Sequence, residues 1–249
     1  MSASHQISQA SGVSDQTRRI LASVGIACIA NALLRRGLRN TCLAGLVPVA
    51  PGQPALVGPA FTLRFIPARE DIDSLENYGR PDNLHRRAIE ECPPGAVLVI
   101  DARSETGVSS AGDMMAARLR ARGAAGIVTD GGFRDAHGIG QTGLPAFHRM
   151  AATPATPLKL HPAEINIPIG CAGVAIYPGD IVVGDVDGVV VIPAHLADEV
   201  AREAREATEY EDFAARHLAR GRSLMGLFPS TPESRAEFKT WVEAGRPEI

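Results

Sequence analysis

Residues 96–135 read AVLVIDARSETGVSSAGDMMAARLRARGAAGIVTDGGFRD, and the predicted fold rests on their pattern. The stretch contains two short apolar runs, 96–101 and 125–130, which are typical of strands buried on both faces of a sheet. Between them, residues 111–122 have the spacing of a helix whose apolar positions are Met114, Met115, Ala117 and Leu119. Strand, helix and strand in about 35 residues predict a right-handed βαβ unit, and hence an α/β protein with a parallel pair of strands.

Charged residues follow this unit at the edge where α/β proteins place their sites, the carboxyl ends of strands and the amino ends of helices. Asp113 opens the helix directly after Gly112, and Arg134 and Asp135 follow a Gly-Gly turn after the second strand. Twenty residues separate Asp113 from Arg134. We therefore expect the two acids and the arginine to meet in one pocket.

These residue types fit a site for a 2-oxo acid. The amides of Gly112, Met114 and Met115 would bind a carboxylate at the helix N-terminus, and Arg134 would add a bidentate contact. Asp135 would hold Mg²⁺ or a similar hard cation, which keeps several waters and needs few protein ligands. Asp113 would orient a water and act as acid or base on an enolate. Two plainer explanations stay open: a solvated Arg-Asp loop, and Asp113 as a helix N-cap.

The residues before the unit predict helices and half-buried strands. We expect a helix over 15–36, with Asp15 as its N-cap and Gly37 at its end. The remaining elements are strands over 43–49 and 56–66, a polar loop over 70–83 and a helix over 83–91.

The residues after the unit predict short strands followed by helices. The strands are expected over 145–148, 165–167, 173–176, 181–185 and 188–192. The last two form a hairpin with Asp187-Gly188 at its tip. Helices over 194–220 and 233–244 complete the chain. We divide it into a flexible arm, 1–15, a catalytic domain, 16–205, and a helical extension, 206–249.

The composition of the chain limits the partners, the compartment and the mechanism that we expect. The chain has 249 residues, a net charge of −3 and 4% aromatic residues, so we expect neither nucleic acid nor a membrane surface as a partner. The polar N-terminus lacks the apolar core of a signal peptide, and the four cysteines form no CxxC pair, so we expect a cytoplasmic protein. Lysine occurs only at Lys159 and Lys239, outside any motif, which disfavours a Schiff-base mechanism.

The sequence resembles the RraA-like family, which includes class II 4-hydroxy-4-methyl-2-oxoglutarate aldolases and regulators of RNase E activity. Some of its members carry the label dimethylmenaquinone methyltransferase. The family's aldolase signature is an Asp, twenty residues and Arg-Asp, which Asp113, Arg134 and Asp135 match without a gap. The similarity spans roughly residues 20–205 and includes SVGIACIANAL at 23–33, GPAFTLRF at 58–65, AGIVTDGGFRD at 125–135 and YPGDIVVGDVDGVVVIP at 177–193.

The resemblance implies a layered β/β/α (αββα) sandwich of the swivelling phosphohistidine-domain-like type, assembled as a homotrimer or a dimer of trimers. It implies that Asp135 is the ligand of Mg²⁺ or Mn²⁺ and that Arg134 binds the pyruvyl group and stabilises its enolate. By the same resemblance, Asp113 positions the water that protonates the enolate, and the amides of Met114 and Met115 hold the substrate carboxylate. The implied reaction is retro-aldol cleavage that releases pyruvate, or decarboxylation of oxaloacetate.

The sequence departs from the family pattern at several places, which leaves the substrate open. Asn31 stands where the family often has Asp, and Met114 and Met115 replace leucines. Aldolases of the family use an Asn from the region of the polar loop, which makes Asn83 a candidate for substrate contact. Glu209 and Glu211 are candidates for the late acid that aldolases bring from a neighbouring subunit, although both fit a solvated helical face better. Two alternatives remain: a dehydratase or hydrolase of a sugar-derived 2-oxo acid, and a non-catalytic regulator that binds an RNase.

Overall fold

The central element of the fold is strand β3 (Val97–Asp101), which lies inside an eight-stranded mixed sheet. The structure, a computed structural model, describes residues 13–248. The strand order is β1-β7-β5-β3-β2-β12-β13, with β9 added on β2. These strands are β1 (Val47–Pro48), β2 (Leu56–Pro67), β5 (Gly126–Thr129), β7 (Ala146–His148), β9 (Leu160–Ile165), β12 (Ile181–Asp185) and β13 (Gly188–Ile192).

The predicted parallel pair is confirmed, because β3 pairs with β5 in parallel register, Val97 opposite Gly126. β3 is buried on both faces, as its apolar run predicted: Leu98 and Ile100 pack towards the helices, and Val97 and Val99 pack towards the antiparallel strands. The α/β class is therefore confirmed, while the phosphohistidine-domain-like type stays a prediction.

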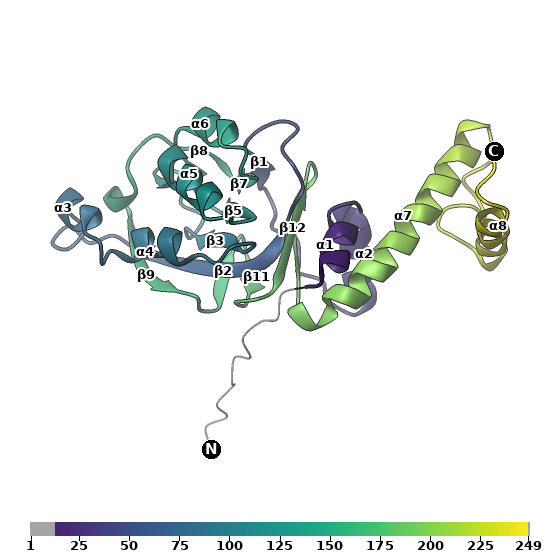
Figure 1. Cartoon of the computed structure of the whole chain (residues 1–249), viewed down its shortest axis with the longest axis horizontal. Coiled ribbons are helices and arrows are strands. Elements are labelled where there is room, and N and C mark those ends of the chain that lie inside the picture. The colour runs from purple at the N-terminus through teal and green to yellow at the C-terminus, as the bar shows by residue number, and fades with distance from the viewer. Residues whose placement is uncertain (1–12, 249) are drawn as a thin grey trace, which may run out of the picture.

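Strand β2 joins the parallel and antiparallel parts of the sheet. Its first residues, 56–59, pair with β12, and residues 60–64 pair with β3. Residues 63–67 pair with β9, with a shift in register between Arg64 and Phe65. Figure 1 shows β2 as the long blue strand that runs beneath the body of the molecule.

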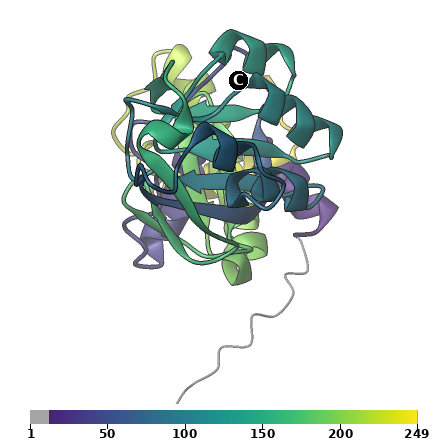
Figure 2. The same cartoon turned by 90° about the vertical axis from the view of Figure 1, so that its left-hand side faces the viewer.

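Helices cover the sheet in two groups. The first comprises α3 (Leu75–Gly79), α4 (Leu84–Glu91), α5 (Asp113–Ala121) and α6 (Ala136–Gln141). The second comprises α1 (Asp15–Leu21), α2 (Ile26–Arg35), α7 (Ala197–Ala219) and α8 (Pro232–Glu243). Figures 1 and 2 show the teal helices α5 and α6 above β2, whereas α1, α2 and α7 lie at the far end beyond β12. No single helix within residues 13–248 is long and apolar enough to cross a bilayer, although α1 and α2 together reach that length.

Two small sheets complete the fold. β4 (Ser109–Ala111), β6 (Gly132–Phe133) and β8 (Met150–Ala151) form a parallel three-stranded sheet next to α5. β10 (Ile169–Cys171) and β11 (Val174–Ile176) form an antiparallel pair. The three-stranded sheet fixes the site, because residues 112–113 and 134–135 leave it at the same end.

The C-terminal residues have a hydrophobic core of their own. The boundary that we drew at 205 falls inside α7, whose first half packs on α1 and α2. Its second half packs on α8 through a separate cluster of Tyr210, Phe213, Ala214, Leu227, Phe238 and Trp241. Figure 1 shows this end of α7 reaching away from the sheet. Most of the N-terminal arm that we predicted, residues 1–12, lies outside the described part of the chain.

The single helix predicted over 15–36 is wrong. Two helices, α1 and α2, meet at 108°. Ser14 is the N-cap of α1, because its Oγ accepts the Thr17 amide hydrogen at 3.1 Å, so Asp15 is not the cap. Gly25 is the N-cap of α2, in an extended conformation that a continuous helix cannot include. Gly37 follows α2 at φ +82°, as the predicted helix end required.

Five further predictions need correction. The strand over 43–49 shrinks to β1, because Leu43 donates to Val189 on the other side of the sheet before the chain turns at Gly45. The loop over 70–83 contains α3, and the strand over 165–167 is replaced by β9 and β10. The hairpin tip is Val186-Asp187, because Asp185 pairs with Gly188. Met114 is 78% exposed and Ala117 is also exposed, so Ala116 and Leu119 are the core positions of α5.

Candidate active site

The structure brings Asp113, Arg134 and Asp135 together at the end of the three-stranded sheet. Asp113 begins α5, directly after β4, while Arg134 and Asp135 follow β6. β4 and β6 are parallel neighbours with Ala111 opposite Phe133, and the Arg134 amide donates to the Ala111 carbonyl at 3.0 Å. The two ends of the twenty-residue stretch therefore meet because the connecting helix returns the chain to an adjacent parallel strand.

Gly112 lets these groups approach closely. A Cβ atom added at Gly112 would lie 3.0 Å from Arg134 Nε and 3.3 Å from Asp135 Oδ2. A second glycine does the same for the other acid, since a Cβ at Gly138 in α6 would lie 2.9 Å from Asp113 Oδ2. Both glycines are thus explained by side-chain approach to the site rather than by a special backbone conformation.

Asp135 occupies an unusual backbone conformation. It has φ 54° and ψ 38°, in the left-handed region that few residues other than glycine adopt. Its Oδ2 lies 3.3 Å from Arg134 Nε, and both side chains are about half exposed, at 53% and 50%. An ion pair this open to solvent contributes little to stability, so both groups remain available to a ligand.

Asp135 fits a divalent cation that keeps most of its own waters. No group of three or more His, Cys, Asp or Glu side chains within residues 13–248 is arranged to hold a metal ion. The donor available is a single half-exposed carboxylate, whose oxygens suit Mg²⁺ or Mn²⁺. The site therefore fits a cation with few protein ligands and does not fit one that needs a full protein cage.

The amides predicted to bind a carboxylate have other partners in the structure. The Met114 amide donates to Asp113 Oδ1 at 2.7 Å, and the Met115 amide donates to the Gly112 carbonyl at 3.1 Å. Both side chains line the cavity beside the site, but Met114 is largely exposed to solvent whereas Met115 is half-buried. Carboxylate binding by these two amides stays a prediction and requires a ligand to replace the present acceptors.

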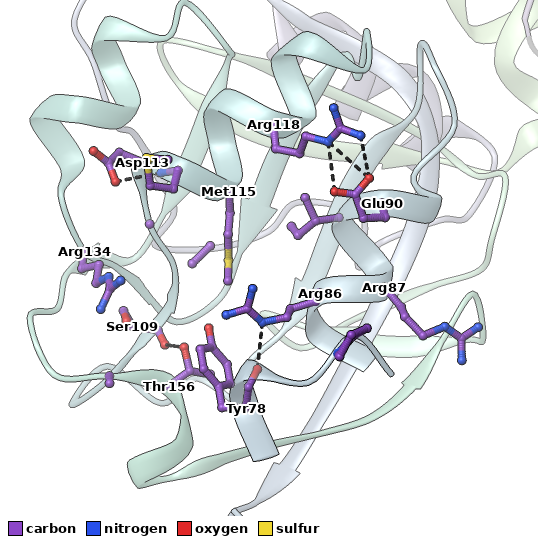
Figure 3. Close-up of a pocket in the computed structure, with 16 residues that line it drawn as sticks. Tyr78, Arg86, Arg87, Glu90, Ser109, Asp113, Met115, Arg118, Arg134 and Thr156 are labelled. Atoms are coloured by element: carbon purple, nitrogen blue, oxygen red, sulfur yellow. Dashed lines mark hydrogen bonds and ion pairs between the residues drawn. The ribbon is translucent and has the colours of Figure 1, made fainter. Parts of the chain in front are cut away.

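A cavity of about 490 Å³ opens beside these residues. Its walls come from α4, the N-terminal half of α5, the end of β6 and the segment around Tyr78. Figure 3 shows Arg134 on one wall and Arg86 reaching in from the opposite one. The side chains that line it are Tyr78, Pro81, Arg86, Arg87, Ile89, Glu90, Ser109, Ala111, Asp113, Met114, Met115, Arg118, Arg134, Ala155 and Thr156.

Part of the charge in the cavity is already neutralised. Arg118 donates to both carboxylate oxygens of Glu90, at distances of 2.8 to 3.2 Å. These hydrogen bonds lower the pKa of the Glu90 carboxyl below its usual value. Sequence reasoning missed α4 as a wall, although Arg86 and Glu90 stand one helical turn apart and hence on the same face.

Asn83 does not line this cavity. Its Oδ1 accepts the His85 amide hydrogen at 3.0 Å, so it is the N-cap of α4. It lines a neighbouring cavity of about 310 Å³, between α3 and β9. Substrate contact by Asn83 therefore stays a prediction to which this placement adds no support.

A buried histidine supports the wall of the cavity. His85 Nδ1 lies 3.2 Å from the Tyr78 hydroxyl, and the ring packs edge-on against Phe65. Burial lowers the pKa of His85 to about 4, with the Ser110 backbone partly opposing the shift. His85 is therefore neutral near pH 7 and holds Tyr78 by a hydrogen bond, with no ion pair involved.

Comparisons with known proteins agree with this fold. The Aldolase/RraA family model, RraA-like, matches residues 12–191. A protein of Halalkalibacterium halodurans with the provisional name 4-hydroxy-4-methyl-2-oxoglutarate aldolase is 34% identical over 201 residues, covering 80% of this chain and 86% of its own. The crystal structure of RraAS2 from Streptomyces coelicolor, described as an unusual member of the RNase ES inhibitor RraA family, matches with a TM-score of 0.72. It is 32% identical, with 84% of this chain and 98% of that chain covered.

A second solved structure, of an uncharacterised protein from Pseudomonas syringae, also matches with a TM-score of 0.72. It is 25% identical, with 85% of this chain and 96% of that chain covered. The family model covers well over half of the present sequence, from just before α1 to within β13. The chain therefore belongs to the RraA-like family, Aldolase/RraA.

Proposed function

We propose that this protein is a divalent-metal-dependent lyase that cleaves a 2-oxo acid through the enolate of pyruvate. The observation that carries the proposal is the close approach of Asp113, Arg134 and Asp135 beside a cavity of small-molecule size. Related proteins named as 4-hydroxy-4-methyl-2-oxoglutarate aldolases support a lyase on such substrates.

Each residue has a distinct task in this proposal. Arg134 binds the pyruvyl carboxylate and keto oxygen through its fork of N–H donors and stabilises the negative charge that develops on that oxygen. Asp135 would hold Mg²⁺ or Mn²⁺, which would supply further positive charge for the same oxygen. Asp113 orients a water that returns a proton to the methylene carbon once the bond to the leaving group has broken.

The lysines support a metal-dependent rather than a Schiff-base mechanism. Lys159 pairs with Glu105 and its side chain is 52% exposed, while the side chain of Lys239 is 79% exposed. Neither lysine lines the cavity, and neither side chain is buried in the way that an activated nucleophilic amine requires.

The test is an assay of pyruvate release from 4-hydroxy-4-methyl-2-oxoglutarate and from oxaloacetate, with added Mg²⁺ or Mn²⁺ and with a chelator. We expect metal-dependent turnover that Arg134→Ala and Asp135→Ala each reduce by about 100-fold or more, since each removes charge from the developing enolate. Asp187→Asn, in the exposed hairpin loop, is the matched control and should leave turnover unchanged. Lack of turnover on any 2-oxo acid, or turnover indifferent to both site variants, would refute the proposal.

A second candidate function is a regulator that binds an RNase. The similarity to Streptomyces coelicolor RraAS2, described as an unusual member of the RNase ES inhibitor RraA protein family, favours it. A dehydratase or hydrolase of a sugar-derived 2-oxo acid would use the same three residues. Pulldown of an RNase by both the wild type and Asp135→Ala, without any turnover, would favour the regulator. Loss of a sugar-derived oxo acid without pyruvate release would favour the dehydratase or hydrolase.

A further inference from the structure

The cavity holds more positive charge than pyruvyl binding uses. Of its four arginines, Arg118 pairs with Glu90 at 2.8 Å and Arg87 pairs with Glu91 at 2.7 Å. Arg134 is assigned to the pyruvyl group. Among residues 13–248, no carboxylate lies within 4.0 Å of the Arg86 guanidinium. Arg86 therefore brings an uncompensated positive charge into the cavity.

Arg86 is held in place by neutral contacts. Its Nε donates to the Tyr78 carbonyl at 2.8 Å, and its guanidinium carbon lies 5.6 Å from the centre of the Tyr78 ring. Tyr78 is itself fixed, because its hydroxyl lies 3.2 Å from Nδ1 of the buried His85. The two terminal nitrogens of Arg86 remain free to donate in parallel to one anion, and part of the entropy cost of ordering the side chain is already met.

Arg86 and Arg134 lie on opposite walls of the cavity. Figure 3 shows Arg86 pointing from α4 into the cavity, whereas Arg87 points away from it. Arg134 lies on the other side of the cavity from Arg86, below Asp113. The side chains of Ile89 and Met115 also line the cavity, and they offer no charge. A volume of about 490 Å³ exceeds what a three-carbon oxo acid needs, so a longer ligand fits between the arginines.

We propose that Arg86, oriented by Tyr78, recognises a second anionic group at the end of the substrate remote from the keto acid. Arg86 then selects 2-oxo acids with a distal oxyanion, either a carboxylate, as 4-hydroxy-4-methyl-2-oxoglutarate carries, or a phosphate. The inference rests on the proposed function in one respect only, the assignment of Arg134 to the keto-acid end. It makes Arg86 a residue that determines specificity, with no part in bond cleavage.

Turnover of a matched pair of substrates tests the role of Arg86. 4-Hydroxy-2-oxoglutarate carries a distal carboxylate, and 4-hydroxy-2-oxopentanoate carries a methyl group in its place. We expect Arg86→Gln to lower kcat/KM for the first by about 10-fold to 100-fold, chiefly through KM, and to change the second by less than about twofold. Arg86→Lys should retain part of the preference, because the charge remains while the paired donors are lost. 2-Dehydro-3-deoxy-6-phosphogluconate carries a distal phosphate and tests that alternative. The substrate with the higher kcat/KM shows whether Arg86 prefers a carboxylate or a phosphate.

The control is Arg120→Gln. Arg120 is exposed on the neighbouring helix α5 and does not line the cavity, so this variant loses the same charge and should keep both kcat/KM values. An Arg86→Gln variant that loses both substrates equally, or neither, would overturn the assignment even though the lyase reaction stands.

A binding measurement separates this inference from the proposed function. Calorimetry compares 2-oxoglutarate with 2-oxopentanoate, which differ only in the distal carboxylate. The wild type should bind 2-oxoglutarate at least about tenfold more tightly, and Arg86→Gln should remove that difference. If no 2-oxo acid is turned over but this preference is present, the lyase proposal fails and the anion subsite stands. Equal binding of the two acids by the wild type, with no preference for the phosphate probe in turnover, refutes the subsite.

Discussion

The substitution Gly112→Ala tests whether the geometry of the three site residues limits activity. Gly112 has φ −139° and ψ −177°, an extended conformation that alanine adopts without strain. The new Cβ would lie 3.0 Å from Arg134 Nε, 3.1 Å from Arg134 Cγ and 3.3 Å from Asp135 Oδ2. The substitution therefore acts on these two side chains and leaves the backbone of the site unchanged.

The size of the effect follows from these distances. Ordinary contacts between carbon atoms are about 3.5–4.0 Å, so the Arg134 and Asp135 side chains must move by roughly 0.5 Å. Both are about half exposed and can move outward, so we expect the free energy of unfolding to change by less than about 1 kcal/mol. A misplacement of about 1 Å can cost about 100-fold in rate, so kcat/KM should fall by about 10-fold to 100-fold.

The assay measures metal-dependent pyruvate release and urea unfolding for the same preparations. Gly170→Ala is the matched control, because a Cβ at Gly170 meets nothing within 4 Å. A Gly112→Ala protein that is folded and fully active would refute the argument that this glycine sets the positions of Arg134 and Asp135. Equal losses in the control would show a general effect of the substitution.

Three further predictions concern stability. The pKa of His85 is about 4 when folded against 6.5 for the free side chain, so between those pH values the unfolded state binds the proton more tightly. The stability contributed by neutral His85 is complete above pH 6.5, and the free energy of unfolding should fall by about 3 kcal/mol as the pH falls towards 4. In urea unfolding, His85→Gln should show a correspondingly flatter dependence of stability on pH. Asp130→Asn should lower the free energy of unfolding by about 2–4 kcal/mol, because the buried carboxylate accepts from three backbone amides and one hydroxyl; an unchanged urea midpoint would contradict this. Tyr210→Phe removes the hydroxyl that contacts the Leu227 carbonyl at 2.5 Å and Ser234 Oγ at 2.7 Å. The free energy of local opening of α8 should therefore fall by about 1–2 kcal/mol, and amide hydrogen exchange in α8 should become faster while exchange in α5 stays unchanged.

The sequence by itself determined the elements whose pattern is local. The two apolar runs and the helix between them specified β3, α5 and β5 and their parallel pairing, since a buried strand and an amphipathic helix each carry their own period. The hairpin of β12 and β13 and the long helix α7 could also be predicted from the sequence. For the same reason, the approach of Asp113 to Arg134 and Asp135 could be predicted, because a βαβ unit places those positions at one edge.

The tertiary structure decided what depends on contacts between distant segments. Nothing in the period of residues 15–36 indicates the turn at Gly25, which exists because α1 and α2 both pack on α7 and the sheet. By contrast, the partners of the Met114 and Met115 amides and the role of Asn83 as an N-cap are set by local geometry at the starts of two helices.

Helix α4, the cavity wall opposite Arg134, shows most clearly the difference between what the sequence and the tertiary structure determine. The sequence places Arg86 beside Arg87 in one polar helix and gives no sign that they differ. In the fold, Arg87 meets Glu91 one turn along the helix, whereas Glu90, the equivalent partner for Arg86, pairs with Arg118 of α5. Arg86 instead meets the Tyr78 carbonyl and ring. Whether a charge is compensated depends on what packs beside it, and that is set by long-range contacts rather than by the residues next to it in the chain.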